Sequence, residues 1–416
     1  MNSTPVARPR RIFRLLWVFL SFLAAMNPSP AQEASRPPVR RVILFMVDGL
    51  HCQALDHVAL PVLRSLIPQG TYVPESWMIM PHHPTVGDYG RLHTTSFPNP
   101  VLMAGTVFLR LDNRFIQEAI NPAGRTAFFV NSLAYSSVSR GFNDLMQDPG
   151  ASDAQVVEAA MAALRREDFK FMRVHLQTAG NVGRTACAYG SADEPFYRNI
   201  WGEGSPYTSA LAEGDRLLGL FVAFLKAERK WDDTVFIFSS DHGQSAQGWH
   251  PVSDPDSWRT PLLFIGPGIA SGRRLAYAEH TDIAPTICAL LGIPSPNPGP
   301  GSGRPIDAIR ADHADDSAAN PRFIERVNRQ NAAYLNCRAW LQLASAKDSH
   351  YSSEITLLEN ELCTPEPFYG MDRFLEWHRA GSTAHLLEAN ERVLQRIRAE
   401  SISAAKVLGI APEQAR

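Results

Sequence analysis

Two short apolar runs in this chain are each followed closely by an aspartate and then a glycine. Residues 42–47 (VILFMV) lead into Asp48-Gly49, and residues 235–238 (VFIF) lead, after two serines, into Asp241-His242-Gly243. Short apolar runs bounded by turn residues are typical of strands that are covered on both faces of a parallel sheet. Ligand sites in such sheets lie just beyond the carboxyl ends of the strands. The two runs therefore predict an α/β core with acids and an imidazole at one edge of its sheet.

Strand and helix patterns alternate along the first two thirds of the chain. Strands are predicted at residues 42–47, 125–130, 170–176, 235–238 and 260–266, and helices at 61–66, 153–166 and 205–227. No hairpin signal joins neighbouring strands, so crossover helices are expected to connect them. The predicted fold is a doubly wound, mostly parallel α/β sheet flanked by helices.

The composition and a stretch rich in Pro, Gly and Ser predict how the chain is divided into domains. The 416 residues are 45% hydrophobic and carry a formal net charge of −2. Such a chain can bury a large core, and it lacks the basic charge expected of a nucleic-acid-binding domain. A stretch rich in Pro, Gly and Ser ends near residue 303, which predicts a catalytic domain over 32–303 and a helical carboxy-terminal extension over 304–416. Helices are expected there at 321–346 and 385–409, and an independent binding module is the alternative reading of the extension.

The amino terminus has the pattern of a secretory signal. An arginine cluster within residues 8–14 precedes the apolar residues 15–25, and small residues around Ala31 offer a cleavage site. We expect a signal peptide over residues 1–31 and an exported chain, periplasmic or secreted, that begins near Gln32. The apolar run is short for a bilayer span, so no transmembrane segment is expected in the mature protein. An uncleaved anchor is the alternative, and general secretion and twin-arginine export both stay open.

A third informative stretch contains Ser96, which is followed by Pro98 and Pro100. Prolines at this spacing fit the first turn of a helix, where no backbone donor is needed, so Ser96 is expected at the amino-terminal edge of a helix. The positive end of the helix dipole favours an alkoxide and any anion that it attacks. Ser96 is therefore a candidate nucleophile, and a purely structural cap is the alternative.

These stretches together offer the donors of a divalent-metal site, namely Asp48, Ser96, Asp241, His242 and His250. Carboxylates and imidazoles beside a hydroxyl suit Zn²⁺, with Mn²⁺ or Mg²⁺ as alternatives. A bound metal would lower the pKa of the hydroxyl and neutralise the charge that grows on a phosphoryl or sulfuryl group. The predicted chemistry is ester cleavage at phosphorus or sulfur.

The motifs resemble those of the alkaline phosphatase superfamily, in particular nucleotide pyrophosphatase/phosphodiesterases and GPI-ethanolamine-phosphate transferases. The similar segments are, in order, VDG (47–49), TSFPN (95–99), AGRT (123–126), SDHG (240–243), GWH (248–250) and DIAPT (282–286). The resemblance extends over roughly residues 41–294. It implies a first metal held by Asp48, Asp241 and His242.

The same resemblance implies roles for three further residues. Ser96 would be the nucleophile and would also contact the first metal, and Asn99 would donate to the transferred group. His250 matches a ligand of a second metal. At the nucleophile position Ser stands where these phosphodiesterases usually have Thr, a chemically conservative exchange.

The chain departs from the family at the second metal. After strand 170–176 the family has Asp-x-x-x-His, and Gly180 and Arg184 occupy those two positions here. Neither side chain binds a cation, so one Zn²⁺ is expected and a second ion is in doubt. In one account Arg184 supplies the missing positive charge, and in another His175 or Asp193 rebuilds the site. In a third, the protein has lost catalysis and serves as an anion- or protein-binding module.

The sequence thus predicts an exported, metal-dependent phosphoric ester hydrolase of the phosphodiesterase type. It would act on a small-molecule phosphate ester through a covalent phospho-Ser96 intermediate. Transfer of a phosphoethanolamine-type group is the alternative, because it needs only a different acceptor. Sulfate esters are disfavoured, because Pro100 stands where the sulfatase pattern Cys/Ser-x-Pro-x-Arg has Arg.

Overall fold

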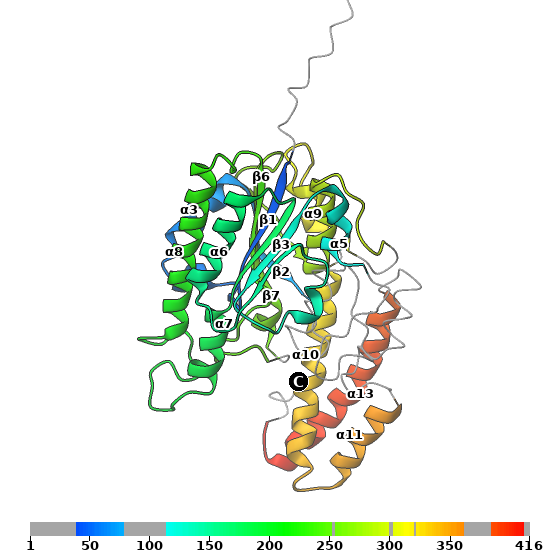
Figure 1. Ribbon diagram of the computed structural model, residues 1–416. Helices are drawn as coiled ribbons and strands as arrows, with labels where there is room; N and C mark the ends of the chain where they lie inside the picture. Colours follow the sequence, from blue (N-terminus) through cyan, green and yellow to red (C-terminus); the bar gives the residue numbers. More distant parts are fainter. Residues whose placement is uncertain are drawn as a thin grey trace, which may run out of the picture. The chain divides into compact units, whose positions relative to one another are not determined.

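A computed structural model of the chain describes residues 39–78, 114–251, 254–298, 303–319, 322–361 and 384–411. All of them lie within one compact unit that spans Val39–Arg416. Ser96 and Asn99, and the expected signal peptide, lie outside the described residues. In the described ranges nine strands form one sheet with the path β4-β3-β5-β1-β6-β7-β2-β8, and β9 pairs with β2 (Figure 1).

The centre of the sheet is parallel. β1 (Arg41–Val47) lies between β5 (Phe171–Leu176) and β6 (Thr234–Ser239) and is parallel to both. β3 (Thr126–Val130) and β4 (Asp144–Gln147) continue the parallel part beyond β5. The observed order confirms the predicted doubly wound, mostly parallel α/β sheet.

The other side of the sheet is mixed. β7 (Arg259–Ile265) is antiparallel to β6 and to β2 (Thr71–Trp77), and β8 (Arg273–Arg274) and β9 (Ala278–Glu279) are parallel to β2. The sequence did not predict β2, which contains Pro74 and Glu75. The pairing of β2 with β7 shifts between Val73 and Ser76, and this irregularity accommodates the proline inside a strand.

Alternate residues of β1 face two different layers of the core. Ile43, Phe45 and Val47 pack in a cluster with residues of α6 (Asp153–Arg166) and α8 (Pro206–Ala227). Val42, Leu44 and Met46 belong to a cluster on the other face, with α9 (Ile283–Leu290) and α5 (Ile116–Ile120). The sheet is therefore covered on both faces, as Figure 1 shows, which explains why its central strands are continuous apolar runs.

Several shorter helices complete the domain. They are α2 (Ala54–His57), α3 (Pro61–Leu66) and α7 (Thr178–Val182), and α7 continues directly into a π-helical segment at Gly183–Ala188. The predicted helices at 61–66, 153–166 and 205–227 agree with α3, α6 and α8. None of the helices in the described ranges combines the length and the hydropathy that a bilayer span requires.

The carboxy-terminal residues form α10 (Phe323–Ala344), α11 (His350–Glu361) and α13 (Ala384–Leu408). The sequence predicted the first and the last of these helices and missed α11. Phe323 and Val327 of α10 share an apolar cluster with Trp77, Trp258 and Tyr277 of the sheet domain. Side chains thus pack across the expected boundary at residue 303, and the division of the chain at that residue stays a prediction.

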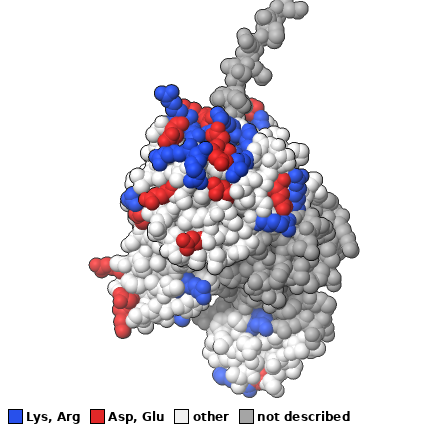
Figure 2. All heavy atoms as spheres, viewed as in Figure 1, with Lys and Arg blue, Asp and Glu red and all other residues white. Residues whose placement is uncertain are grey.

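Charged side chains gather at the amino-terminal ends of the central strands. Arg41, buried at the start of β1, pairs with Asp168 and Asp233, which lie just before β5 and β6, and Lys230 lies 3.1 Å from Asp168. In Figure 2 basic and acidic groups are mixed at the top of the view, where these strands begin. The candidate site lies at the opposite, carboxyl ends of the same strands.

A paired substitution on α8 tests the packing of this core. Phe221 is fully buried, with its ring centroid 5.6 Å from that of Phe45, whereas its neighbour Leu220 is 47% exposed. Phe221→Ala should lower the free energy of unfolding by about 3–5 kcal/mol, because it leaves a cavity between helix and sheet. Leu220→Ala should change it by no more than about 0.5 kcal/mol. Chemical denaturation followed by circular dichroism measures both, and equal losses would contradict this view of the core.

Candidate metal centre

Two carboxylates meet where β1 and β6 end. The strands are parallel neighbours, so Asp48 after β1 and Asp241 after β6 reach the same edge of the sheet. Both side chains are buried, with 3% and 0% of Asp48 and Asp241 exposed. Gly49 turns the chain with a φ of +61° and donates its N–H to Asp241 Oδ1 at 3.3 Å. The local sequence Asp-Gly thus permits both the turn and the contact between the two loops.

The two carboxylates have opposite pKa shifts. Burial, together with the neighbouring charge of Asp241, raises the pKa of Asp48 well above its ordinary value. Burial also opposes ionisation of Asp241, but His242, His175 and Arg173 lower the pKa of that carboxyl below its usual range. Two negative charges this close are unfavourable in a buried site without a cation between them. The pair is therefore suited to a divalent ion, which would stabilise both carboxylates in their ionised form.

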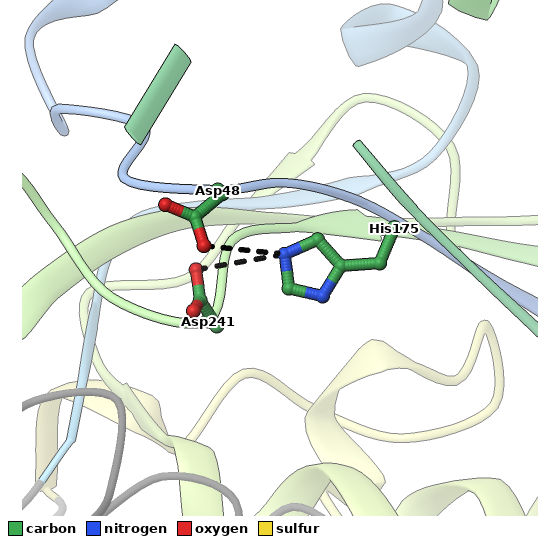
Figure 3. Close-up of side chains that lie close together, drawn as sticks. All are labelled: Asp48, His175 and Asp241. Atoms are coloured by element: carbon green, nitrogen blue, oxygen red, sulfur yellow. Dashed lines mark ion pairs between the residues drawn. The ribbon is translucent and has the colours of Figure 1, made fainter. Parts of the chain in front are cut away.

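His175 faces the two carboxylates from the neighbouring strand β5 (Figure 3). Its Nε2 lies 3.7 Å from Asp48 Oδ2 and 3.8 Å from Asp241 Oδ1, and burial lowers its pKa to about 3. One possible ligand atom from each of the three residues lies within 4.8 Å of the others, so Asp48, His175 and Asp241 form a group that could hold a metal ion. The sequence named His175 only as a possible part of a second site.

His242 contacts the same pair of carboxylates. Its Nε2 lies 3.4 Å from Asp241 Oδ2 and 4.0 Å from Asp48 Oδ1, and its Nδ1 lies 2.8 Å from the carbonyl oxygen of Gly243. A carbonyl only accepts, so Nδ1 carries the proton and the lone pair of a neutral ring is on Nε2. That lone pair faces the carboxylates, which is the orientation a metal ligand requires.

Two more of the expected residues, His250 and Arg184, are linked to His242 by a series of ring contacts that includes Trp249. The buried ring of His250 lies 4.1 Å from that of His242 and 3.6 Å from that of Trp249. The exposed Arg184 places its guanidinium 4.6 Å from the centre of the Trp249 ring. The structure thus brings His250 to the site and places Arg184 over Trp249, at the exposed end of these ring contacts. Asp193, the other suggested replacement ligand, is exposed.

Gly180 lies directly against Asp48. A Cβ atom added to Gly180 would come within 1.5 Å of Asp48 Oδ1. A side chain at position 180 would therefore have to displace the carboxylate from its present position. This close contact gives a physical reason for glycine at the point where the resembling family has an aspartate.

Three residues that the sequence did not suggest also contact the carboxylates or His175. Tyr135 Oη lies 3.2 Å from Asp48 Oδ2 and 3.0 Å from Asp241 Oδ2, and Gln177 Nε2 donates to Asp48 Oδ2. Arg173 Nη2 lies 2.9 Å from His175 Nδ1. Gln177 directly follows the strand predicted at 170–176, and that position could have indicated that it lies at the site. Tyr135 carried no such signal, because its position depends on how a loop folds over the sheet.

A sheet of this topology, with acids and histidines at the carboxyl ends of its central strands, defines a protein of the alkaline phosphatase-like class. Residues 116–293 match the model of the Sulfatase family, and the chain is similar to proteins of the alkaline phosphatase superfamily.

Similar sequences include transferases and sulfatases. GPI ethanolamine phosphate transferase 1 of Saccharomyces cerevisiae is 24% identical over 399 residues, which cover 82% of this chain and 42% of that protein. Choline-sulfatase of Rhizobium meliloti is 35% identical over 91 residues, 21% of this chain and 18% of that enzyme. The chain spans less than half the length of the ethanolamine phosphate transferases that it matches.

Solved structures confirm the fold. The phosphonate monoester hydrolase of Silicibacter pomeroyi has a TM-score of 0.53 at 16% identity, with 66% of this chain and 78% of that chain covered. Human ectonucleotide pyrophosphatase/phosphodiesterase 5 has a TM-score of 0.51 at 15% identity, with 65% and 100% covered.

The contact between Gly180 and Asp48 can be tested by a single methyl group. Gly180→Ala should weaken zinc binding by about 10–100-fold, because the methyl group must push the Asp48 carboxylate out of place. Gly214→Ala is the matched control, since an added Cβ on this α8 glycine would meet Val47 Cγ2 at an ordinary 3.5 Å. Zinc affinity is measured by competition with a chromogenic chelator. Equal affinities in both variants and the wild type would show that the carboxylate is not a ligand.

Proposed function

We propose that this protein is a metal-dependent phosphoric ester hydrolase of the phosphodiesterase type that acts through a covalent phospho-Ser96 intermediate. The superfamily includes phosphoester hydrolases and transferases, which sets the class of chemistry. The observation that most supports the proposal is the geometry of His242. Its Nε2 lone pair faces two buried carboxylates, an arrangement that is unfavourable until a cation lies between them.

The described residues fit one divalent ion. Asp48 and Asp241 offer oxygens, His242 offers Nε2, and Ser96 would add its hydroxyl from outside the described residues. This mixture of ligands suits Zn²⁺, with Mn²⁺ or Mg²⁺ as alternatives. When bound, the ion would lower the pKa of the Ser96 hydroxyl and neutralise negative charge on the phosphoryl oxygens.

The chain's own residues would then divide the reaction into two displacements. In the first, Ser96, its hydroxyl proton released to solvent, forms an Oγ–phosphorus bond while the bond to the ester oxygen breaks, and His250 donates a proton to the departing alcohol. In the second, His250 takes a proton from the water that attacks phosphorus, the bond to Ser96 Oγ breaks, and Ser96 leaves as the alkoxide from which the first step begins. Asn99 and Arg184 would donate hydrogen bonds to the phosphoryl oxygens during both steps.

Replacement of Ser96 tests this proposal directly. Ser96→Ala should reduce the hydrolysis of bis(4-nitrophenyl) phosphate to the rate of buffer alone, because no oxygen remains to form the intermediate. Zinc should stay bound through the two aspartates and His242. Ser271→Ala, a substitution of an exposed serine on the sheet domain, should keep the full rate. If the wild type contains no metal and hydrolyses no faster than Ser96→Ala, the enzyme proposal fails and a binding module takes its place.

Transfer is the second candidate function, because an ethanolamine phosphate transferase of Saccharomyces cerevisiae matches 82% of the chain. The first displacement would be the same, and an alcohol would replace water in the second. Adding ethanolamine or glycerol to the reaction separates the two activities by mass spectrometry of the products. A phosphorylated acceptor in excess of the free monoester identifies a transferase. 4-Nitrophenyl sulfate in a parallel reaction tests the sulfatase alternative.

We also infer that the protein is exported after cleavage near Ala31, from the arginine cluster and the apolar residues 15–25 that follow it. Expression of the whole chain with a carboxy-terminal tag should give a product outside the cytoplasm whose first residue lies near Gln32. Mass spectrometry of the amino-terminal peptide measures this. Recovery of the uncut chain in the membrane fraction would favour an anchor instead.

A further inference from the structure

Arg173 is an arginine buried inside the sheet, directly behind the candidate site. It lies in the middle of β5 with 0% of its surface exposed. Its guanidinium lies 4.8 Å from the ring centre of Phe128 and 5.0 Å from that of Tyr135, which fixes the position of the charge. Burial of a guanidinium costs free energy unless neighbouring groups accept its hydrogen bonds, because the group stays charged at any physiological pH.

The contact between Arg173 and His175 determines which nitrogen of the histidine carries its proton. Arg173 Nη2 lies 2.9 Å from His175 Nδ1, and a guanidinium can only donate. Nδ1 of His175 must therefore accept, and the proton of the neutral ring is on Nε2. His242 has the opposite tautomer, since its Nδ1 donates to the carbonyl of Gly243.

The hydrogen on His175 Nε2 is directed toward Tyr135. Nε2 lies 3.3 Å from Tyr135 Oη, closer than to either carboxylate. If Tyr135 accepts this hydrogen bond, its own hydroxyl proton is free for Asp241 Oδ2 at 3.0 Å or Asp48 Oδ2 at 3.2 Å. The hydrogen bonds then run in one direction, from Arg173 Nη2 through His175 and Tyr135 to the carboxylates.

We propose that Arg173, His175 and Tyr135 form a one-directional hydrogen-bond chain that positions Asp48 and Asp241 for a single metal ion, and that His175 is not a ligand of that ion. The proposal rests on the metal-dependent function proposed above. The chain directs the Tyr135 hydroxyl proton at Asp241 Oδ2 or Asp48 Oδ2, and Gln177 Nε2 donates to Asp48 Oδ2 as well. Asp48 Oδ1 is then the oxygen that remains on the side of His242.

Such a chain explains how the site can work with one ion. Two buried carboxylates need positive charge on more than one side, and Arg173 supplies part of it from inside the sheet. The three residues are positioning residues, because in this arrangement none of them touches the ion or the substrate. Arg184, which lies over the Trp249 ring, would be left to act on the substrate instead.

Direct observation of the tautomers is the first test. In the intact, metal-free protein with ¹⁵N-labelled histidine, long-range ¹⁵N–¹H spectra should show His175 protonated on Nε2 and His242 protonated on Nδ1. His175→Gln and His242→Gln assign the signals. A His175 ring protonated on Nδ1 would overturn the proposal, whether or not the protein proves to be an enzyme.

Zinc affinity separates a positioning residue from a ligand. His242→Gln should abolish stoichiometric zinc binding. His175→Gln should bind one zinc with nearly the affinity of the wild type, because the amide can still donate toward Tyr135. His175→Leu and Tyr135→Phe, which end the chain, should bind one zinc about 10–100-fold more weakly. If His175→Gln loses zinc as completely as His242→Gln, His175 is a ligand and the proposal is wrong. Absence of zinc from the wild type would instead contradict the proposed function.

Discussion

The unfavourable proximity of two buried carboxylates is the constraint on which this site depends. Asp48 and Asp241 meet because β1 and β6 are adjacent and parallel, so their carboxyl ends reach the same edge of the sheet. Burial of both strands on both faces then removes the acids from water. The side chains around them act chiefly to offset that cost, either as donors of hydrogen bonds or as potential partners of a shared cation.

The parts of the site that the sequence predicted are those encoded locally. A strand that ends in Asp-Gly or Asp-His-Gly positions its acid by the geometry of one strand and one turn, and the alternation of strands with helices implies parallel neighbours. Asp48, Asp241 and His242 could therefore be named in advance, and their positions in the fold agree with that prediction. Because β1 and β6 contain continuous apolar runs, the class of the sheet could be predicted as well.

The parts that could not be predicted depend on strand order and on loops. The sequence alone does not say that β5 lies beside β1. It therefore suggested His175 as part of a second metal site and could not place it against Asp48 and Asp241. Tyr135 reaches the carboxylates from a loop with no periodic pattern. Arg173 was a missed signal, because a charged residue within an apolar strand requires a specific partner. β2 was missed because Pro74 interrupts the strand pattern.

Gly180 and Arg173 together suggest how the same fold can hold either a two-metal site, as in the resembling family, or the one-metal site proposed for this chain. In the resembling family an aspartate at the position of Gly180 would help to bind a second metal ion. The positive charge of that ion is present only when the metal is bound. Here Asp48 Oδ1 occupies the space that such a side chain needs, and a guanidinium within the protein donates toward the same group of residues. The guanidinium of Arg173 is part of the protein, so its positive charge is always present. From inside the sheet, however, it cannot contact a substrate. Under the proposed function, positive charge on the substrate side would then come from Arg184, whose guanidinium lies over the Trp249 ring. In that proposal the absence of the two family ligands and the presence of the two arginines belong to one electrostatic arrangement, in which Arg173 acts on the carboxylates and Arg184 on the ester.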